Sequence, residues 1–436
     1  MAASLGLTAV TAAALLALGG TSPAATSFVI CVLGIFLSLP ILPQRREWLS
    51  IAHSRIAITA LLGLPLITAI QAAIFLIQPR SGSPTAATAE SFVLLVAYLL
   101  FFLCAATIAR SSRQARIIVL GLFAIGFVEA VYGSLNLLSG NQTLLFFKRW
   151  AYFDSATGTL VNRNHFAYLL EMTIPVGFLV ARTATPGRQP LDVRSIHTED
   201  GARRTLLGLP VAVMLLALAL SRSRMGLASL IGATTVVLLL DRALRPAVDR
   251  SRSLAGSRVT ALVVIGMALF LLFGVGVDVA FERFSRAPAD LEVGRFPVWA
   301  DAWRMFLAHP FFGSGMGSFE YLNASFREGP TGFFVTHAHC DYLEVLAESG
   351  IGGLAVVVLW IALFGRRLVR SLRLPLEPVR RSYVIATAVG ILSVIFHSTV
   401  DFGLRVPGVT LTLLLLVAVF LNASVGAGTA ATAQHK

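Results

Sequence analysis

The sequence predicts an all-α polytopic membrane protein with about twelve transmembrane helices. The chain has 436 residues, of which 56% are hydrophobic and only 13% are charged, and its mean hydropathy is +0.79. A soluble core does not need so many apolar residues. Apolar runs of bilayer length also recur along the chain, and basic residues gather in alternate connections between them.

Each expected span is an apolar run, because a membrane-crossing helix needs about 17 to 25 such residues. In chain order the spans are 3–20, 26–42, 56–77, 91–109, 117–138, 166–181, 205–221, 226–240, 260–280, 342–364, 383–402 and 409–425. The first run lacks a basic leading segment and a small-residue cleavage site, so we expect a retained span rather than a signal peptide. The two spans on either side of Arg222 leave only a short turn between them.

The distribution of charge orients these spans. With the amino terminus inside, the inward connections and the tail hold 23 of the 35 lysines and arginines but only 7 of the 22 acidic residues. The inner segments therefore carry a net charge of +16 and the remainder −3. This is the positive-inside pattern, and it does not indicate a nucleic-acid partner. We expect the inward arginines to contact membrane lipids at their headgroups.

The whole chain, 1–436, is expected to form a single membrane domain with an outer cap. The largest outward connection, 281–341, lies between the ninth and tenth spans and is long enough to fold as a small helical subdomain. The other long outward connection is 139–165. The three cysteines are far apart, two of them inside apolar runs, and they imply no disulfide framework.

Two groups of polar residues lie at the outer ends of the sixth to eighth spans. Arg163 and His165 stand at the start of the sixth span, where a histidine is more often a hydrogen-bonded anchor than a catalyst. Arg222 and Arg224 occupy a short external turn, against the positive-inside tendency, so an outer anion is expected to hold them. A guanidinium suits a phosphate held by two hydrogen bonds. Snorkelling of these arginines toward lipid headgroups is the alternative.

Within 281–341 a helix is expected to start near Pro297, a residue that suits a first turn. Arg295 stands just before it, beside the positive end of the helix dipole, which favours an anion. Arg304 is spaced to pair with Asp301. The apolar residues of this helix form one stripe suited to the membrane surface, namely Trp299, Ala302, Trp303 and Phe306. The glycines that follow at 313–317 indicate a tight turn rather than a phosphate cradle.

A cluster of titratable residues, 336–350, opens the tenth span with two histidines and three carboxylates. Ionisable groups are costly at a membrane boundary, so this cluster indicates a functional site. A metal site is the alternative, here or at 290–292. Against it, the adjacent His339, Cys340 and Asp341 would point in different directions from a helix.

These motifs together resemble one known family, the O-antigen ligase and polymerase superfamily. The residues that match its signature, His-Asn-x-Tyr-Leu-x-x-Leu-x-Glu-x-Gly, are His339, Tyr342, Leu343, Leu346, Glu348 and Gly350. Weaker matches cover 162–166 with Glu171, 223–226, the helix with Arg295, Trp299 and Arg304, 309–315, and His397 with Asp401 and Phe402. Cys340 replaces the usual asparagine, which puts in doubt whatever that amide does for acceptor binding.

The resemblance implies a GT-C-like glycosyltransferase of the bacterial inner membrane that works at the periplasmic face in lipopolysaccharide or other surface-polysaccharide biosynthesis. It would transfer a glycan from undecaprenyl diphosphate either to lipid A-core, as a ligase, or to a growing glycan, as a polymerase. The reaction would invert the anomeric carbon and use no metal or other cofactor, and the periplasmic loop 281–341 would hold part of the active site.

The resemblance also implies roles for single residues. Arg224 and Arg295 would hold the diphosphate, because a departing diphosphate needs fixed positive charge. His339 would deprotonate the acceptor hydroxyl, since an imidazole is suited to accepting a proton near neutral pH. The residues expected to contact substrate are Arg222, Arg163, His165, Tyr342, Glu348 and Arg304.

A secondary transporter with twelve spans is the alternative from another class. The long inward connection after the sixth span matches the layout of the major facilitator group. However, the connection 43–55 lacks the signature of that group, and the charged residues lie at the outer face rather than at mid-membrane. Uptake assays in liposomes would separate a transporter from a transferase.

Overall fold

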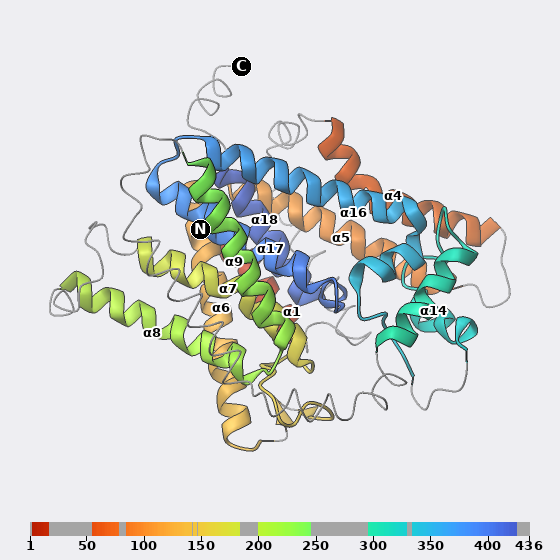
Figure 1. The fold of residues 1–436 in the computed structure, drawn as a ribbon, viewed down its shortest axis with the longest axis horizontal. Helices are drawn as coiled ribbons and strands as arrows, with labels where there is room; N and C mark the ends of the chain where they lie inside the picture. The colour runs from red at the N-terminus through yellow and green to blue at the C-terminus, as the bar shows by residue number, and fades with distance from the viewer. Residues whose placement is uncertain are drawn as a thin grey trace.

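The computed structural model describes residues 2–16, 55–77, 84–141, 143–145, 147–183, 199–245, 295–328 and 334–424. Within these ranges the chain is largely helical (Figure 1). Six helices are long and apolar enough to cross a membrane: α5 (Thr85–Ile108), α6 (Ser112–Leu138), α7 (Arg163–Thr183), α9 (Arg224–Leu244), α16 (Asp341–Arg373) and α17 (Pro378–His397). The helices with shorter apolar stretches are α1 (Ala2–Leu16), α4 (Arg55–Ile77), α8 (Glu199–Leu220) and α18 (Pro407–Ala423).

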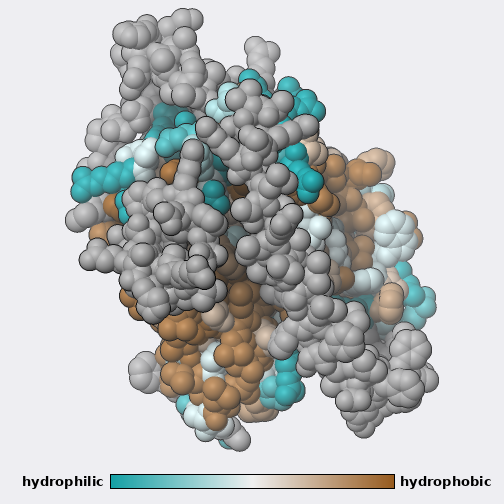
Figure 2. Space-filling model, turned by 60° about the vertical axis from the view of Figure 1, so that its left-hand side comes forward, coloured by the Kyte–Doolittle hydropathy of each residue, from teal (hydrophilic) through white to brown (hydrophobic). Residues whose placement is uncertain are grey.

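Ten of the twelve expected spans coincide with these helices. The other two, 26–42 and 260–280, lie outside the described residues. The structure therefore agrees with an all-α polytopic membrane protein, while twelve as the number of spans stays a prediction. Hydrophobic residues gather in patches at the lower left and on the right of Figure 2, as expected for helices that meet lipid.

The core of the bundle is built around α7 and α17. The apolar window of α7 is 78% buried, against 33% for α5 and α9, so α7 is enclosed by other helices. α17 packs against α7, α9 and α18. A Cβ atom on Gly390 of α17 would lie 3.1 Å from the backbone oxygen of Met172 in α7, so glycine allows the two backbones to come close.

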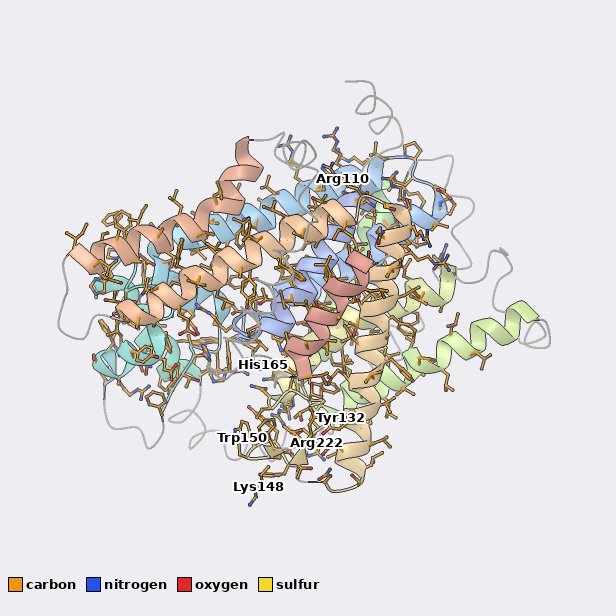
Figure 3. All side chains as sticks on the ribbon, turned by 180° about the vertical axis from the view of Figure 1, so that it is seen from behind. Arg110, Tyr132, Lys148, Trp150, His165 and Arg222 are labelled. Carbon is orange, nitrogen blue, oxygen red and sulfur yellow. The ribbon has the colours of Figure 1, made fainter. Side chains whose placement is uncertain are left out.

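One end of the bundle is closed by arginines. Arg381 of α17 pairs with Asp241 of α9 at 2.7 Å, and Arg367 of α16 donates to the hydroxyl of Ser424 at 2.7 Å. Arg110 lies at this end, far from Trp150 and Arg222 at the other (Figure 3). Within the described residues, the guanidinium groups of Arg367 and Arg381, from a segment expected to face inward, thus satisfy a helix-end hydroxyl and a carboxylate.

The connection expected as the outer cap contains α14 (Arg295–Ala308), α15 (Phe319–Leu322) and the 3₁₀ helix η3 (Asn323–Phe326). These elements pack against the start of α16 around a small hydrophobic core. Its buried residues are Ala302, Met305, Phe319, Val335, Ala338 and Ala347. The predicted membrane-facing stripe is wrong at Ala302, which is 0% exposed because it packs into this small core. The apolar side chains that α14 does expose are Phe296, Trp303 and Leu307.

A further short element lies in the connection after α6. Strands β1 (Thr143–Leu144) and β2 (Phe147–Lys148) pair antiparallel as a small hairpin. The helices α8 and α9 are separated by only three residues, 221–223, as the close spacing of the two spans predicted.

Candidate functional site

Four helices begin at the same end of the bundle. The first described residues of α7, α9 and α14 are Arg163, Arg224 and Arg295, and α16 begins at Asp341. A helix start exposes unpaired N–H groups and the positive end of the dipole, so an arginine there is unfavourable unless an anion is near. Three arginines in this position therefore point to an anion-binding site.

Asp401 joins these helix starts. It lies in the turn after α17, its side chain is 0% exposed, and it accepts a hydrogen bond from the Asn164 amide of α7. Its Oδ2 lies 3.6 Å from Nη2 of Arg295, and its Oδ1 lies 3.8 Å from Nδ1 of His339. Burial alone would raise the pKa of Asp401, but the nearby histidines, with His339 foremost, hold it well below its usual range. The carboxylate is therefore ionised in the folded protein.

His339 directs one ring nitrogen toward Asp401. The Nδ1 atom is buried near that carboxylate, which leaves Nε2 as the nitrogen available to a substrate, and 36% of the side chain is exposed. The backbone of His339 has a φ of 51°, an uncommon left-handed conformation for a residue with a side chain. Such strain is often found at functional sites.

The ring of Phe402 lies among three histidines. Its centroid is 4.7 Å from that of His165, 4.3 Å from His337 and 4.9 Å from His339. No role of their own was expected for Phe402 and Asp401, because both lie at the end of an apolar run expected to be a span. An aspartate is costly at the end of such a run, and this cost could have indicated that Asp401 belongs to a functional site.

Beside the histidines lies a cluster of buried charges. Arg405, in the 3₁₀ helix η4 (Gly403–Arg405), pairs with Glu344 at 3.2 Å and with Glu348 at 2.6 Å, and each glutamate is 1% exposed. His337 Nδ1 also lies 2.9 Å from Glu344. Burial alone would lower the pKa of His337, but the Glu344 carboxylate raises it above the ordinary value. These pairs fix the first turns of α16 to the segment that holds Asp401.

The start of α16 is capped without an asparagine. Cys340 occupies the N-cap position, and its side chain makes no capping hydrogen bond. The N–H of Asp341 instead donates to the backbone oxygens of Ser398 at 3.0 Å and Asp401 at 3.1 Å. An asparagine at an N-cap would accept from the N–H of the second or third helical residue. Here the first helical N–H is paired instead, with backbone carbonyls of the turn 398–401.

The expected arginines differ in their surroundings. Arg224 is exposed and has no hydrogen bond or ion pair within the part of the chain that the structure describes. Arg163 lies over the ring of Tyr152 at 5.4 Å, and its buried Nε lacks a hydrogen-bond partner. Arg222 is 60% exposed and pairs with Asp154 at 2.9 Å. Arg163, Arg224 and Arg295 thus bring three guanidinium groups to these helix starts, and the buried Asp401 carboxylate lies near one of them, Arg295.

The other expected substrate contacts lie mostly inside the structure. Arg304 pairs with Asp301, as its spacing predicted, and with Glu328 at 2.7 Å. The Tyr342 hydroxyl donates to the backbone oxygen of Ile395 at 2.7 Å, and Glu348 is held by Arg405. His165 is 4% exposed, with Nε2 unpaired. The polar atoms of Arg304, Tyr342 and Glu348 are therefore bonded to other groups of the protein and support the site from within.

A further pair, Glu171 and His397, lies just inside the bundle. His397 Nδ1 is 3.2 Å from Glu171 Oε1, both side chains are 0% exposed, and the histidine ring stacks on Tyr168 with centroids 4.0 Å apart. A Cβ on Gly226 would lie 3.5 Å from this histidine, so the start of α9 rests on the pair. The pair thus supports the helix end that presents Arg224.

The glycines at 313–317 form a tight turn, as the sequence indicated. Three of them have positive φ, at 69°, 110° and 77°. The N–H groups of Ser314 and Gly315 donate to the backbone oxygens of Ala347 and Glu348, just before α16 breaks at Gly350. Those N–H groups are already used and do not form a phosphate cradle.

The sequence allowed a metal site at two places, within 336–350 or at 290–292. Asp290 and Glu292, at the second place, lie outside the described residues. Within the described ranges, no group of three or more histidine, cysteine, aspartate or glutamate side chains is arranged to hold a metal ion.

The fold and the site define a multi-pass membrane protein with arginine-headed helix starts beside a histidine–aspartate pair. Residues 209–358 match the family model described as O-antigen ligase. The match confirms the resemblance seen in the motifs and supports membership of the O-antigen ligase superfamily. It also supports a membrane enzyme of lipopolysaccharide or surface-polysaccharide biosynthesis. No curated protein matches the chain.

The matched range covers part of the site. It includes Arg222, Arg224, Arg295 and His339, whereas Arg163, His165 and Asp401 fall outside it. The tertiary structure brings these two sets together at one end of the bundle.

Proposed function

We propose that the protein is an inverting glycosyltransferase that moves a glycan from undecaprenyl diphosphate to an acceptor hydroxyl. The observation that carries the proposal is the meeting of three arginine-headed helix starts beside His339 and Asp401. A diphosphate diester carries one negative charge on each phosphate, and Arg163, Arg224 and Arg295 offer positive charge for it at the helix starts.

The arginines supply the leaving-group chemistry. As the bond between the anomeric carbon and the diphosphate breaks, its electron pair moves to the phosphate oxygen. Fixed positive charge near that oxygen stabilises the transition state. Arginine can also hold a phosphate by two parallel hydrogen bonds. Arg224 can fill this role because it has no ion pair within the described residues. Arg295 can do so because its pair with Asp401 is long, at 3.6 Å, and 41% of its side chain is exposed.

His339 supplies the base. Its Nε2 takes the proton of the acceptor hydroxyl as the hydroxyl oxygen attacks the anomeric carbon from the side opposite the diphosphate, which inverts the configuration. Asp401, near Nδ1, orients the ring and stabilises the imidazolium that forms. His337 is unsuited to this role, because its ion pair with Glu344 favours the protonated ring.

The acceptor is lipid A-core if the protein is a ligase and a growing glycan if it is a polymerase. The same site serves both reactions, at the periplasmic face of the bacterial inner membrane. A deletion strain separates them: loss of a ligase leaves long chains on the lipid carrier, whereas loss of a polymerase leaves single repeats on the acceptor.

The proposal is tested by Arg224→Lys and Arg295→Lys in purified protein. Lysine keeps the charge but cannot make the planar two-pronged contact. We expect donor binding and transfer rate to fall by about tenfold to a hundredfold, the value of roughly 1.5–3 kcal/mol for a lost charged hydrogen bond. Arg242→Lys, at the opposite end of α9 from Arg224, is the matched control. Normal donor binding in both test variants would show that these arginines only anchor the protein at headgroups.

A further inference from the structure

The connection between α6 and α7 holds a loop, 147–155, that its own arginine makes rigid. Arg149 is 2% exposed. Its Nε donates to the backbone oxygen of Ala151 at 3.0 Å, and its Nη2 donates to that of Ser155 at 2.6 Å and to that of Tyr152. The guanidinium is thus used inside the loop rather than displayed to a ligand.

Neighbouring helices also hold this loop in place. The N–H of Leu145 donates to the Tyr132 hydroxyl of α6 at 2.7 Å, and Asp154 pairs with Arg222 between α8 and α9. Leu145 and Tyr152 have φ values of 53° and 55°, which bulky residues rarely adopt. Such conformations persist only where the surroundings fix them, and they are often found at ligand sites.

This rigid loop exposes three aromatic side chains. Phe147 is 51% exposed, Trp150 60% and Phe153 53%. Lys148 and Trp150 project near Tyr132 and Arg222 at the end of the molecule opposite Arg110 (Figure 3). Aromatic rings held on a rigid loop offer a large contact area at little cost in conformational entropy.

The loop adjoins the arginines at the starts of α7 and α9. Tyr152 lies under the guanidinium of Arg163 at 5.4 Å, and Asp154 pairs with Arg222, two residues before Arg224. A diphosphate bound at these arginines would therefore lie beside this loop, which puts the loop within reach of a glycan attached to that diphosphate.

We propose that Phe147, Trp150 and Phe153 form a binding platform for the sugar rings of the lipid-linked donor; this rests on the proposed function. A sugar ring has an apolar C–H face that suits an aromatic face, and edge hydroxyls that suit a carboxylate. Asp154, 60% exposed, supplies such a carboxylate beside the rings. The same exposed carboxylate disfavours burial of the loop among lipid acyl chains.

The test compares two probes in purified protein reconstituted in nanodiscs. One probe is undecaprenyl diphosphate alone, and the other is undecaprenyl diphosphate carrying a trisaccharide of hexoses. We expect the parent to bind the glycosylated probe more tightly. Trp150→Ala and Phe153→Ala should each weaken binding of that probe about three- to tenfold, from the typical value of an aromatic contact, and leave binding of the bare carrier unchanged.

Two further variants serve as controls. Trp150→Tyr, which keeps an aromatic face, should retain most of the affinity for the glycosylated probe. Trp303→Ala removes a comparably exposed ring on α14 and should change neither affinity. Melting temperatures of all variants show that each is folded.

The outcomes distinguish this inference from the proposed function. Equal loss of both probes in Trp150→Ala would overturn the platform and place the ring against the carrier or the headgroup layer. Unchanged binding of the glycosylated probe in both alanine variants would also overturn it. If the parent bound neither probe, the proposed function would fail first, and the platform with it.

Discussion

Replacing Arg405 by methionine is expected to destabilise the protein and to displace His339. The guanidinium pairs with Glu348 at 2.6 Å and with Glu344 at 3.2 Å. Both carboxylates are 1% exposed and Arg405 is 19% exposed, so water screens these pairs little. Methionine keeps much of the apolar length of the side chain but leaves the carboxylates without the arginine.

The structure sets the size of the effect. Breaking a buried ion pair by removing one partner costs about 3–5 kcal/mol, because a charge is left buried without compensation. Glu344 still has His337 at 2.9 Å, so Glu348 bears most of the loss. Glu348→Gln in the Arg405→Met background should therefore recover part of the stability. The exposed ion pair of Arg222 and Asp154 serves as the comparison. Removing Arg222 should change the stability little, because exposed ion pairs contribute only about 0–1 kcal/mol.

The assay is thermal unfolding of purified protein in one detergent, together with the transfer rate. The order of midpoints should be parent close to Arg222→Met, then the double variant, then Arg405→Met. The transfer rate should fall in Arg405→Met, because the start of α16 loses its tie to the segment that holds Asp401. An unchanged midpoint in Arg405→Met would refute the reasoning, as would a double variant no more stable than the single one.

Other predictions follow from the same structure. His339→Ala should cut turnover by about 10²–10⁴ with donor binding nearly intact, whereas His337→Ala should keep a substantial fraction; the reverse result would exchange the two roles. Transfer by purified protein should survive EDTA, and a strict requirement for added Mg²⁺ or Mn²⁺ would count against the arginine mechanism. The pair with Glu344 raises the pKa of His337 above its unfolded value, so the stability it adds is complete below about pH 6.5 and lost as pH rises through the folded pKa. Melting temperatures across this pH range should therefore show a fall that Glu344→Gln removes; the same fall in that variant would assign it to another group. Gly350→Ala should lower the melting temperature, because φ is 64° there and a Cβ would lie 2.4 Å from a backbone oxygen; an unchanged value would mean that the break in α16 is not fixed at this residue.

The sequence determined which segments are helical and apolar, because these properties depend on local composition. Hydropathy over about twenty residues reports whether a helix can remain in lipid, and ten of the twelve expected spans coincide with described helices. The turn at Arg222, the pairing of Arg304 with Asp301 and the turn at 313–317 were also local and were predicted correctly. Arg224, also expected in the turn at Arg222, instead begins α9.

The site needed the tertiary structure, because its contacts join distant parts of the chain. Nothing local to His339 indicates that Asp401 lies beside it, or that Arg405 holds Glu348. The sequence also placed Ala302 on a membrane-facing stripe, because periodicity identifies an apolar face but not what covers it.

The sequence by itself thus determined the class of the protein and the residue types at the site: arginines at helix starts and a histidine before the tenth span. Only the tertiary structure decided which of them lie together. The physical reason is that insertion of a helix into lipid depends on its own composition, whereas pairing of charges depends on where helix ends meet. Close backbone packing sets those meeting points, such as that between Gly390 and Met172 in the core of the bundle.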